Sequence, residues 1–190
     1  KVQQLDEAKI IQKRMNSFDI GYLPPIRGVQ IATGTSTLIQ TEGQSGAKST
    51  GNPRELFAKV PGLNIWESDA AGLQMGIGGR GLSPNRTSNF NTRQNGYDMS
   101  ADALGYPESY YTPPSESLER VEVIRGASSL QYGTQFGGLI NFRFKDPDTN
   151  RIRLTTRFTY GSFAFLNSFT SVSGTAGKFR YYSFYQYKQG

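Results

Sequence analysis

The sequence contains neither cysteine nor histidine among its 190 residues. Their absence excludes disulfides, thiolate nucleophiles, imidazole bases and the usual zinc sites, and with them most familiar hydrolase chemistry. No stretch approaches the roughly 20 apolar residues that a transmembrane helix needs. Residues 1–4 open without the apolar core of a secretory signal, so we expect that a signal was removed or never existed. Any contact with a membrane is therefore expected to involve strands.

Glycine and aromatic residues are abundant instead. There are 22 glycines, aromatic residues make up 13% of the chain, and only 36% of the residues are hydrophobic. Because aromatics favour strands and glycine favours turns, this composition predicts turn-rich β structure. The formal net charge of +6 suits an anionic solute, anionic lipid or nucleic acid, or serves only solubility.

Aromatic residues concentrate at the end of the chain, where polar and apolar side chains alternate. The segment 151–160 has one cationic, polar face and one apolar face, which carries Ile152, Leu154, Phe158 and Tyr160. A second strand at 178–189 alternates similarly except at Tyr182 and Phe184, and a middle strand is expected at roughly 165–173. Such segments are typical of lipid-facing barrel strands, although a soluble antiparallel sheet also alternates. Hydrocarbon cannot satisfy open sheet edges, so the membrane interpretation predicts that the chain is a fragment.

The residues before 148 predict a mixed α+β domain. A helix is expected with Asn52 as N-cap and Pro53 as its first residue, burying Leu56, Phe57 and Val60. Strands are predicted at 63–66, 121–124 and 137–142, and a short helical turn at 128–131.

Several motifs with catalytic or ligand-binding precedents lack the context that those functions need. The glycines of 76–81 match the dinucleotide fingerprint G-x-G-x-x-G, but a proline-bearing loop follows in place of a helix, so we expect a structural turn. General acid/base catalysis needs convergent carboxylates in a cleft, which nothing here predicts for Glu116, Glu119 and Glu122. A weaker hypothesis is that Asp98, Asp102 and Glu108 bind calcium. These residues lack the regular spacing of a known calcium loop.

Arginines of the middle region are candidates for binding an anion. They are interspersed with asparagine and tyrosine and would suit an anionic ligand or a nucleic-acid backbone. The alternative is that they are ordinary surface arginines. The residues are Arg80, Arg86, Arg93 and Arg125. The loop 86–111 is long and polar, and long structured loops often carry function.

Four segments, in order, resemble the plug of TonB-dependent outer-membrane receptors. They are 52–65 (NPRELFAKVPGLNI), 78–82 (GGRGL), 118–126 (LERVEVIRG) and 131–142 (QYGTQFGGLINF). Within that family, 80–86 and 131–142 are most similar to the ferric citrate transporters. The resemblance implies an α+β plug domain followed by the first strands of a transmembrane antiparallel β-barrel, which has about 22 strands in the family, so that the chain is a fragment of the full receptor. The implied division is an N-terminal extension with a TonB box at 1–20, the plug domain at 21–148, and the first strands of the barrel, about three, at 149–190.

The resemblance also implies a function. The protein would not be an enzyme and would need no cofactor; it would import a scarce solute, a ferric siderophore or ferric citrate, across the outer membrane of a Gram-negative bacterium. The alternatives are a non-iron solute such as a glycan, peptide or cobalamin, a receptor-like subunit of a secretion or signalling assembly, and a soluble module for single-stranded nucleic acid. The implied partners are the TonB C-terminal domain with its inner-membrane energising complex, outer-membrane lipid, the ferric chelate or other small solute, and a surface lipoprotein, but no nucleic acid.

The same resemblance assigns residues to three sites. The TonB box, which would add as a strand to the edge of a partner's sheet, is Leu5, Asp6, Glu7, Ala8, Lys9, Ile10 and Ile11. An ionic lock between plug and barrel wall would use Arg80 and Arg125, with Glu122 in the same network. The residues expected on the substrate side are Arg86, Arg93, Tyr106, Ser109 and Tyr110.

Overall fold

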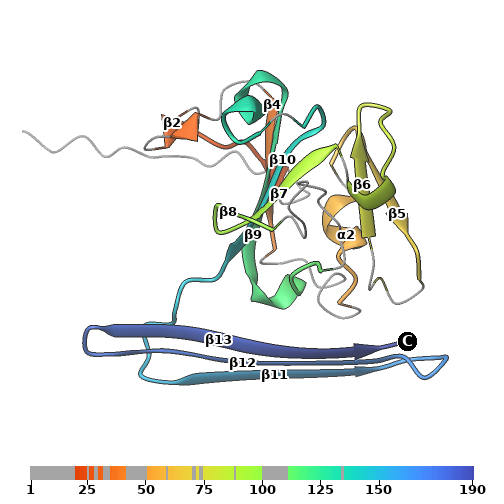
Figure 1. Cartoon of the computed structure of the whole chain (residues 1–190). Coiled ribbons are helices and arrows are strands. Elements are labelled where there is room, and N and C mark those ends of the chain that lie inside the picture. Colours follow the sequence, from red (N-terminus) through yellow and green to blue (C-terminus); the bar gives the residue numbers. More distant parts are fainter. Residues whose placement is uncertain are drawn as a thin grey trace, which may run out of the picture.

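The structure is a computed structural model of the chain. It describes residues 20–24, 26–27, 30–31, 35–41, 51–58, 60–69, 72, 75–87, 89–99, 111–133 and 135–190. Within these ranges the chain forms a six-stranded sheet, a three-stranded sheet and two two-stranded sheets (Figure 1). In the same ranges, no helix is long and apolar enough to cross a membrane.

The six-stranded sheet has the order β1-β4-β9-β10-β7-β8. Its strands are β1 (Ile20–Gly21), β4 (Thr35–Gln40), β7 (Phe90–Gln94), β8 (Tyr97–Asp98), β9 (Leu118–Arg125) and β10 (Gly138–Phe144). Strands β10 and β7 pair in parallel, and the other neighbours are antiparallel. Asn95 and Gly96 join β7 to β8 with φ of 50° and 88°, the left-handed conformation that Asn-Gly favours in a tight hairpin.

One face of this sheet is covered by a short helix and a hairpin. They are α2 (Arg54–Phe57), β5 (Leu63–Glu67) and β6 (Met75–Gly79). The predicted helix is confirmed with its buried Leu56, Phe57 and Val60, but it begins at Arg54, with Pro53 at the cap position and the Asn52 side chain accepting from the Arg54 N–H at 2.8 Å. The resulting core contains Ile39, Met75, Phe90, Val121, Val123, Ile140 and Phe142.

The glycines of β6 allow the next loop to fold back onto the strand. A Cβ on Gly76 would collide with the carbonyl of Pro84, and one on Gly78 would lie 2.5 Å from the carbonyl of Leu82. The chain then forms η1 (Asn85–Thr87), a single turn of 3-10 helix, so the segment has no long helix whose N-terminus could bind a pyrophosphate.

Three long strands form a separate antiparallel sheet, β11-β12-β13, with the bounds Arg153–Tyr160, Leu166–Ala176 and Phe179–Gln189. Figure 1 shows this sheet as a layer below the rest of the molecule, next to η2 (Ser115–Ser117) and the start of β9. All three predicted strands of the tail are confirmed, and the middle one runs three residues further than the predicted 165–173. The smaller elements are β2 (Ile26–Arg27), β3 (Gln30–Ile31) and η3 (Gly126–Gln131), the predicted turn after β9.

Candidate functional site

Several predicted site residues lie outside the described residues. These are the whole segment 5–11, together with Tyr106, Ser109 and Tyr110, and also Asp102 and Glu108 of the calcium hypothesis. Arg86 lies in η1, where the backbone alone is described. Their proposed roles therefore stay predictions.

The structure brings Arg80 and Arg125 together. The Arg80 Nη2 atom lies 3.6 Å from the position that a Cβ would take on Gly126, the residue after Arg125. Burial, and then the charge of Arg80, lower the pKa of Arg125, although a guanidinium stays ionised. Arg125 donates from Nη1 to the Pro61 carbonyl at 2.7 Å and from Nη2 to Thr37 Oγ1 at 3.0 Å. Its buried Nε has no hydrogen-bond partner within the described part of the chain.

This pair of cations is suited to an acidic group, and the described residues supply none there. Figure 1 shows η3, which follows Arg125, at the end of the six-stranded sheet that is farther from β11–β13. A carboxylate approaching this side would meet two guanidinium groups, one of them with a free buried donor.

Glu122 lies apart from these two arginines. Side chains alternate along β9, so Glu122 projects from the face opposite to Val121, Val123 and Arg125. There it accepts from Arg120 Nε at 2.9 Å and from Asn141 Nδ2 at 2.8 Å. The structure therefore does not bring Glu122 into one group with Arg80 and Arg125.

Arg93 is bound within the sheet. Its Nε donates to Asn91 Oδ1 at 2.7 Å, Nη1 to the Gly96 carbonyl at 2.8 Å and Nη2 to the Tyr132 carbonyl at 3.1 Å. The guanidinium also lies 5.1 Å from the centre of the Tyr132 ring, within the range of a cation–π contact. Arg93 thus ties the Asn95–Gly96 turn to the end of η3, a structural role that sequence reasoning did not predict.

Asp98, the described member of the calcium hypothesis, accepts a hydrogen bond from Asn91 Nδ2 at 3.2 Å. Among the described residues, no group of three or more acidic side chains is placed to hold a metal ion.

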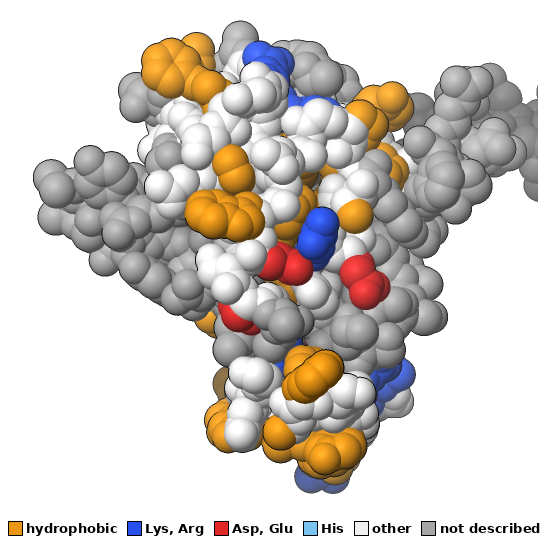
Figure 2. Space-filling view, turned by 90° about the vertical axis from the view of Figure 1, so that its right-hand side faces the viewer, with side chains coloured by type: hydrophobic (Ala, Val, Ile, Leu, Met, Phe, Trp, Pro, Cys, Tyr) orange, Lys and Arg blue, Asp and Glu red, His pale blue; other side chains and the backbone are white. Residues whose placement is uncertain are grey.

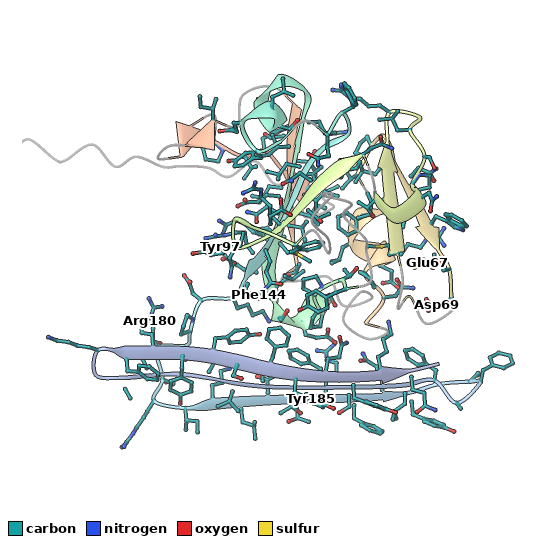
Figure 3. The ribbon with its side chains drawn as sticks, in the orientation of Figure 1. Glu67, Asp69, Tyr97, Phe144, Arg180 and Tyr185 are labelled. Atoms are coloured by element: carbon teal, nitrogen blue, oxygen red, sulfur yellow. The ribbon has the colours of Figure 1, made fainter. Side chains whose placement is uncertain are left out.

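The three-stranded sheet presents one face to the domain built on the six-stranded sheet. The register places Thr155, Ser171 and Phe184 in one row across the strands, and Arg157, Phe169 and Gln186 in the next. Phe169 is 1% exposed. Phe184 packs edge-on against Phe144 of β10, with ring centres 5.2 Å apart, and stacks on Phe169 at 6.1 Å. Figure 3 shows Phe144 between the end of β10 and β13. This face therefore packs on the six-stranded sheet through aromatic side chains.

Further contacts fix the two layers at both ends of this face. The Lys188 ammonium donates to the Gly51 carbonyl at 3.1 Å. In the connection to β11, Asp148 N–H donates to Ser173 Oγ at 2.7 Å, and Arg153 pairs with the Asp148 carboxylate at 2.8 Å. The Arg153 hydrogen bond is the first cause of the lowered pKa of Asp148.

Glu116 of η2 is the buried acid of this interface. Its side chain is nearly inaccessible, and Oε1 has no hydrogen-bond partner among the described residues, while Oε2 accepts from Ser115 Oγ at 3.2 Å. Burial raises the pKa of Glu116, against the smaller opposing effects of its hydrogen bonds and of the charges of Arg157 and Lys145.

The opposite face of the three-stranded sheet is apolar and uncovered. The exposed fraction is 66% for Leu154 and Phe158 and 68% for Tyr185, against 1% for Phe169 on the inner face. Ile152, Tyr160 and Phe179 are also exposed. Figure 2 shows apolar side chains at the lower end of the molecule, and Figure 3 places Tyr185 on the side of the three-stranded sheet away from the six-stranded sheet. A two-faced sheet of this kind can separate a hydrocarbon phase from a protein interior.

Tyr182 and Phe184 therefore have a structural explanation. Both project from the inner face of β13, where Phe184 meets Phe144 and Phe169. The interruption of the alternation was the one signal in the sequence that these positions contact another part of the chain.

In the comparison with known proteins, residues 29–139 match the family model of the TonB-dependent receptor plug domain. The ferric enterobactin receptor PirA of Pseudomonas aeruginosa is 33% identical over 112 residues, which take in 52% of this chain and 15% of that protein. This chain therefore spans a small part of the length of that relative.

Solved structures share the fold. The unliganded ferric citrate transporter FecA matches with a TM-score of 0.56 and 22% identity over 80% of this chain and 25% of that one. The ferripyoverdine receptor of the outer membrane of Pseudomonas aeruginosa matches with a TM-score of 0.57 and 22% identity over 80% of this chain and 20% of that one. The expected fold, a plug followed by antiparallel strands, is confirmed, whereas the particular likeness to ferric citrate transporters stays a prediction.

Proposed function

Because the chain belongs to the TonB-dependent receptor plug domain family, we propose that it forms the plug and the first wall strands of an importer in the outer membrane of a Gram-negative bacterium. The importer binds a scarce solute outside the cell and moves it inward when TonB and the inner-membrane energising complex displace the plug. No covalent chemistry is required. The domain division 1–20, 21–148 and 149–190 belongs to the same proposal.

The observation that carries this proposal is the two-faced sheet β11–β13. Its outer face exposes Leu154, Phe158 and Tyr185, and its inner face buries Phe169 against the plug. In a soluble protein, an apolar surface of this extent would need a partner, whereas lipid covers it directly. The polar side chains that share the inner rows with Phe169 and Phe184, among them Thr155, Ser171 and Gln186, match a wall that encloses a plug rather than a second hydrophobic core.

The paired arginines support the proposed lock. Arg125 ends β9 directly before η3, and Arg80 lies beside it. Figure 1 shows η3 at the end of the molecule away from β11–β13, where the proposed rest of a closed wall would stand. An acidic residue of that wall would pair with both guanidinium groups, and breaking such a buried pair costs about 3–5 kcal/mol. Glu122 is not part of this lock, because it bonds to Arg120 and Asn141 on the other face of β9.

We further propose that the solute is a ferric chelate. The relatives include receptors named for ferric enterobactin, ferric citrate and ferripyoverdine. Arg86, Tyr106, Ser109 and Tyr110 remain the candidates for contacting it, whereas Arg93 is engaged within the plug. Uptake of a non-iron solute is the competing hypothesis, and expression that does not respond to iron would favour it.

The experiment that tests the proposal separates binding from transport. Deleting residues 5–11 should leave ferric-chelate binding to cells unchanged and abolish energised uptake, because an extended box grips TonB by main-chain hydrogen bonds. Ile10→Pro should do the same, since proline removes a donor from the added strand. The matched control Ser17→Pro, outside the box, should import at the wild-type rate. Uptake that persists in the deletion would contradict the box assignment.

A further inference from the structure

Two cavities lie along the contact between the plug and β11–β13. The first, about 310 Å³, lies between the segment 111–114, Gly51 and the end of β13 that carries Gln186 and Lys188. The second, about 430 Å³, lies between Glu116 and Lys145 of the plug and the inner side chains Arg157 and Ser173. Tyr182 lines the second cavity, and Phe184, Gln186 and Lys188 line the first, so the two cavities lie at different depths along the same strand.

Both cavities are suited to water. A single water needs roughly 10–15 Å³ of such volume and two or more polar partners, so each cavity has room for several. Glu116 Oε1, a buried atom with no hydrogen-bond partner among the described residues, belongs to a side chain that lines the second cavity. Asn167 Nδ2 is also a buried atom with no hydrogen-bond partner among the described residues. It lies beside Gly51 and Gln186, which line the first cavity. Water in the cavities would satisfy these buried polar atoms.

An aromatic cluster stands between the two cavities. Phe144 comes from the plug, and Phe169 and Phe184 come from neighbouring strands of the sheet. Phe184 touches both partners, edge-on to Phe144 at 5.2 Å and stacked on Phe169 at 6.1 Å. Phe184 also lines the first cavity and Phe169 the second. These three rings, which we call the aromatic bridge, join plug and wall where the two cavities approach each other.

We propose that the aromatic bridge is a hydrophobic seal, which closes a hydrated route between plug and wall to water and small ions. This inference rests on the proposed function, since a route of this kind matters only in a wall that crosses a membrane. Charged side chains line the cavities on both sides of the seal: Lys188 in the first, and Arg157 and Glu116 in the second. These side chains would bind water next to the seal. The three rings offer an ion no polar partner, so an ion that passes them must lose part of its hydration shell.

The prediction is a leak when the bridge is cut. In the complete receptor reconstituted in a planar lipid bilayer, Phe184→Ala should raise the resting K⁺ and Cl⁻ conductance about tenfold or more over wild type, because the truncation joins the two hydrated spaces. Phe184→Leu should stay closed, since leucine keeps the constriction apolar and largely filled. The matched control is Tyr185→Ala, one residue further and on the exposed outer face, which should also stay closed.

The outcomes separate the inference from the function on which it rests. A receptor that lacks the plug is the positive control for an open wall. If that variant conducts and Phe184→Ala, correctly assembled by gel mobility, is as tight as wild type, the seal is refuted. If the plug-less receptor is also silent, the importer proposal itself fails. Should Phe184→Ala not assemble, Phe144→Ala cuts the bridge from the plug side, and a silent Phe144→Ala receptor then refutes the seal.

Discussion

Replacing Arg93 by alanine tests whether this arginine holds the plug together or contacts the solute. The change removes three hydrogen bonds, to Asn91, Gly96 and Tyr132, at 2.7, 2.8 and 3.1 Å. Bonds from a charged donor contribute about 1.5–3 kcal/mol when buried, and about 1 kcal/mol is appropriate for a half-buried guanidinium. The expected loss in local stability is therefore about 3 kcal/mol, which corresponds to a roughly 150-fold larger equilibrium constant for local opening.

Native-state hydrogen exchange on the complete receptor measures this loss, in peptides covering 93–98 and 130–133. Arg93→Lys keeps the charge but replaces at most one of the bonds, so it should recover about 1 kcal/mol. Arg143→Ala, on the adjacent strand β10, is the control and should change exchange in these peptides by less than about 0.5 kcal/mol. Unchanged exchange in Arg93→Ala together with a large loss of ferric-chelate affinity would refute the structural role and return Arg93 to the solute site.

Three further predictions concern the interface and the lock. Burial raises the pKa of Glu116 above its ordinary value of 4.5. Its contribution to stability is therefore present below pH 4.5 and is lost as the pH rises through the raised pKa. Glu116→Gln should gain stability relative to wild type as the pH rises above about 4.5, and a pH-independent difference in unfolding free energy would contradict this. Gly51→Ala should destabilise the plug–wall contact by about 1–3 kcal/mol more than Gly177→Ala. Both glycines have a φ of 63°, but only a Cβ on Gly51 meets another side chain, that of Asn167. Equal effects of the two substitutions in thermal melts would show that the clash is relieved. Loss of the proposed lock would be common to Arg125→Ala and Arg80→Ala. Arg125→Ala should lower protection from hydrogen exchange in 60–66 by about 1–2 kcal/mol more than Arg80→Ala does, because only Arg125 also bonds to the Pro61 carbonyl and to Thr37; the reverse order would contradict the geometry.

Local patterns were sufficient to predict most elements of the fold. Alternation predicted β11 and β13, and proline and glycine set the ends of the short helix that buries Leu56 and Phe57. The position of Glu122 could also have been predicted, because residues three apart on a strand face opposite sides of the sheet, so Glu122 and Arg125 cannot share one face of β9.

Long-range contacts were beyond the sequence. Arg93 bonds to the Tyr132 carbonyl 39 residues away, and Phe144 meets Phe184 across two sheets. The identity of a polar or aromatic residue does not predict which residue it contacts. An arginine between two turns is equally consistent with a ligand contact and with a hydrogen-bonded link between the turns. The broken alternation at Tyr182 and Phe184 indicated only that a partner exists.

The central claim is that β11–β13 separate lipid from the plug, and spin-label accessibility along β13 tests it most directly. With single nitroxide labels at 183–188 in the complete receptor in lipid, collisions with dissolved oxygen should peak at Tyr185 and Tyr187 and fall at Phe184 and Gln186, because oxygen concentrates in hydrocarbon and the inner positions face the plug. Uniform accessibility along the strand, or maxima at Phe184 and Gln186, would contradict the account.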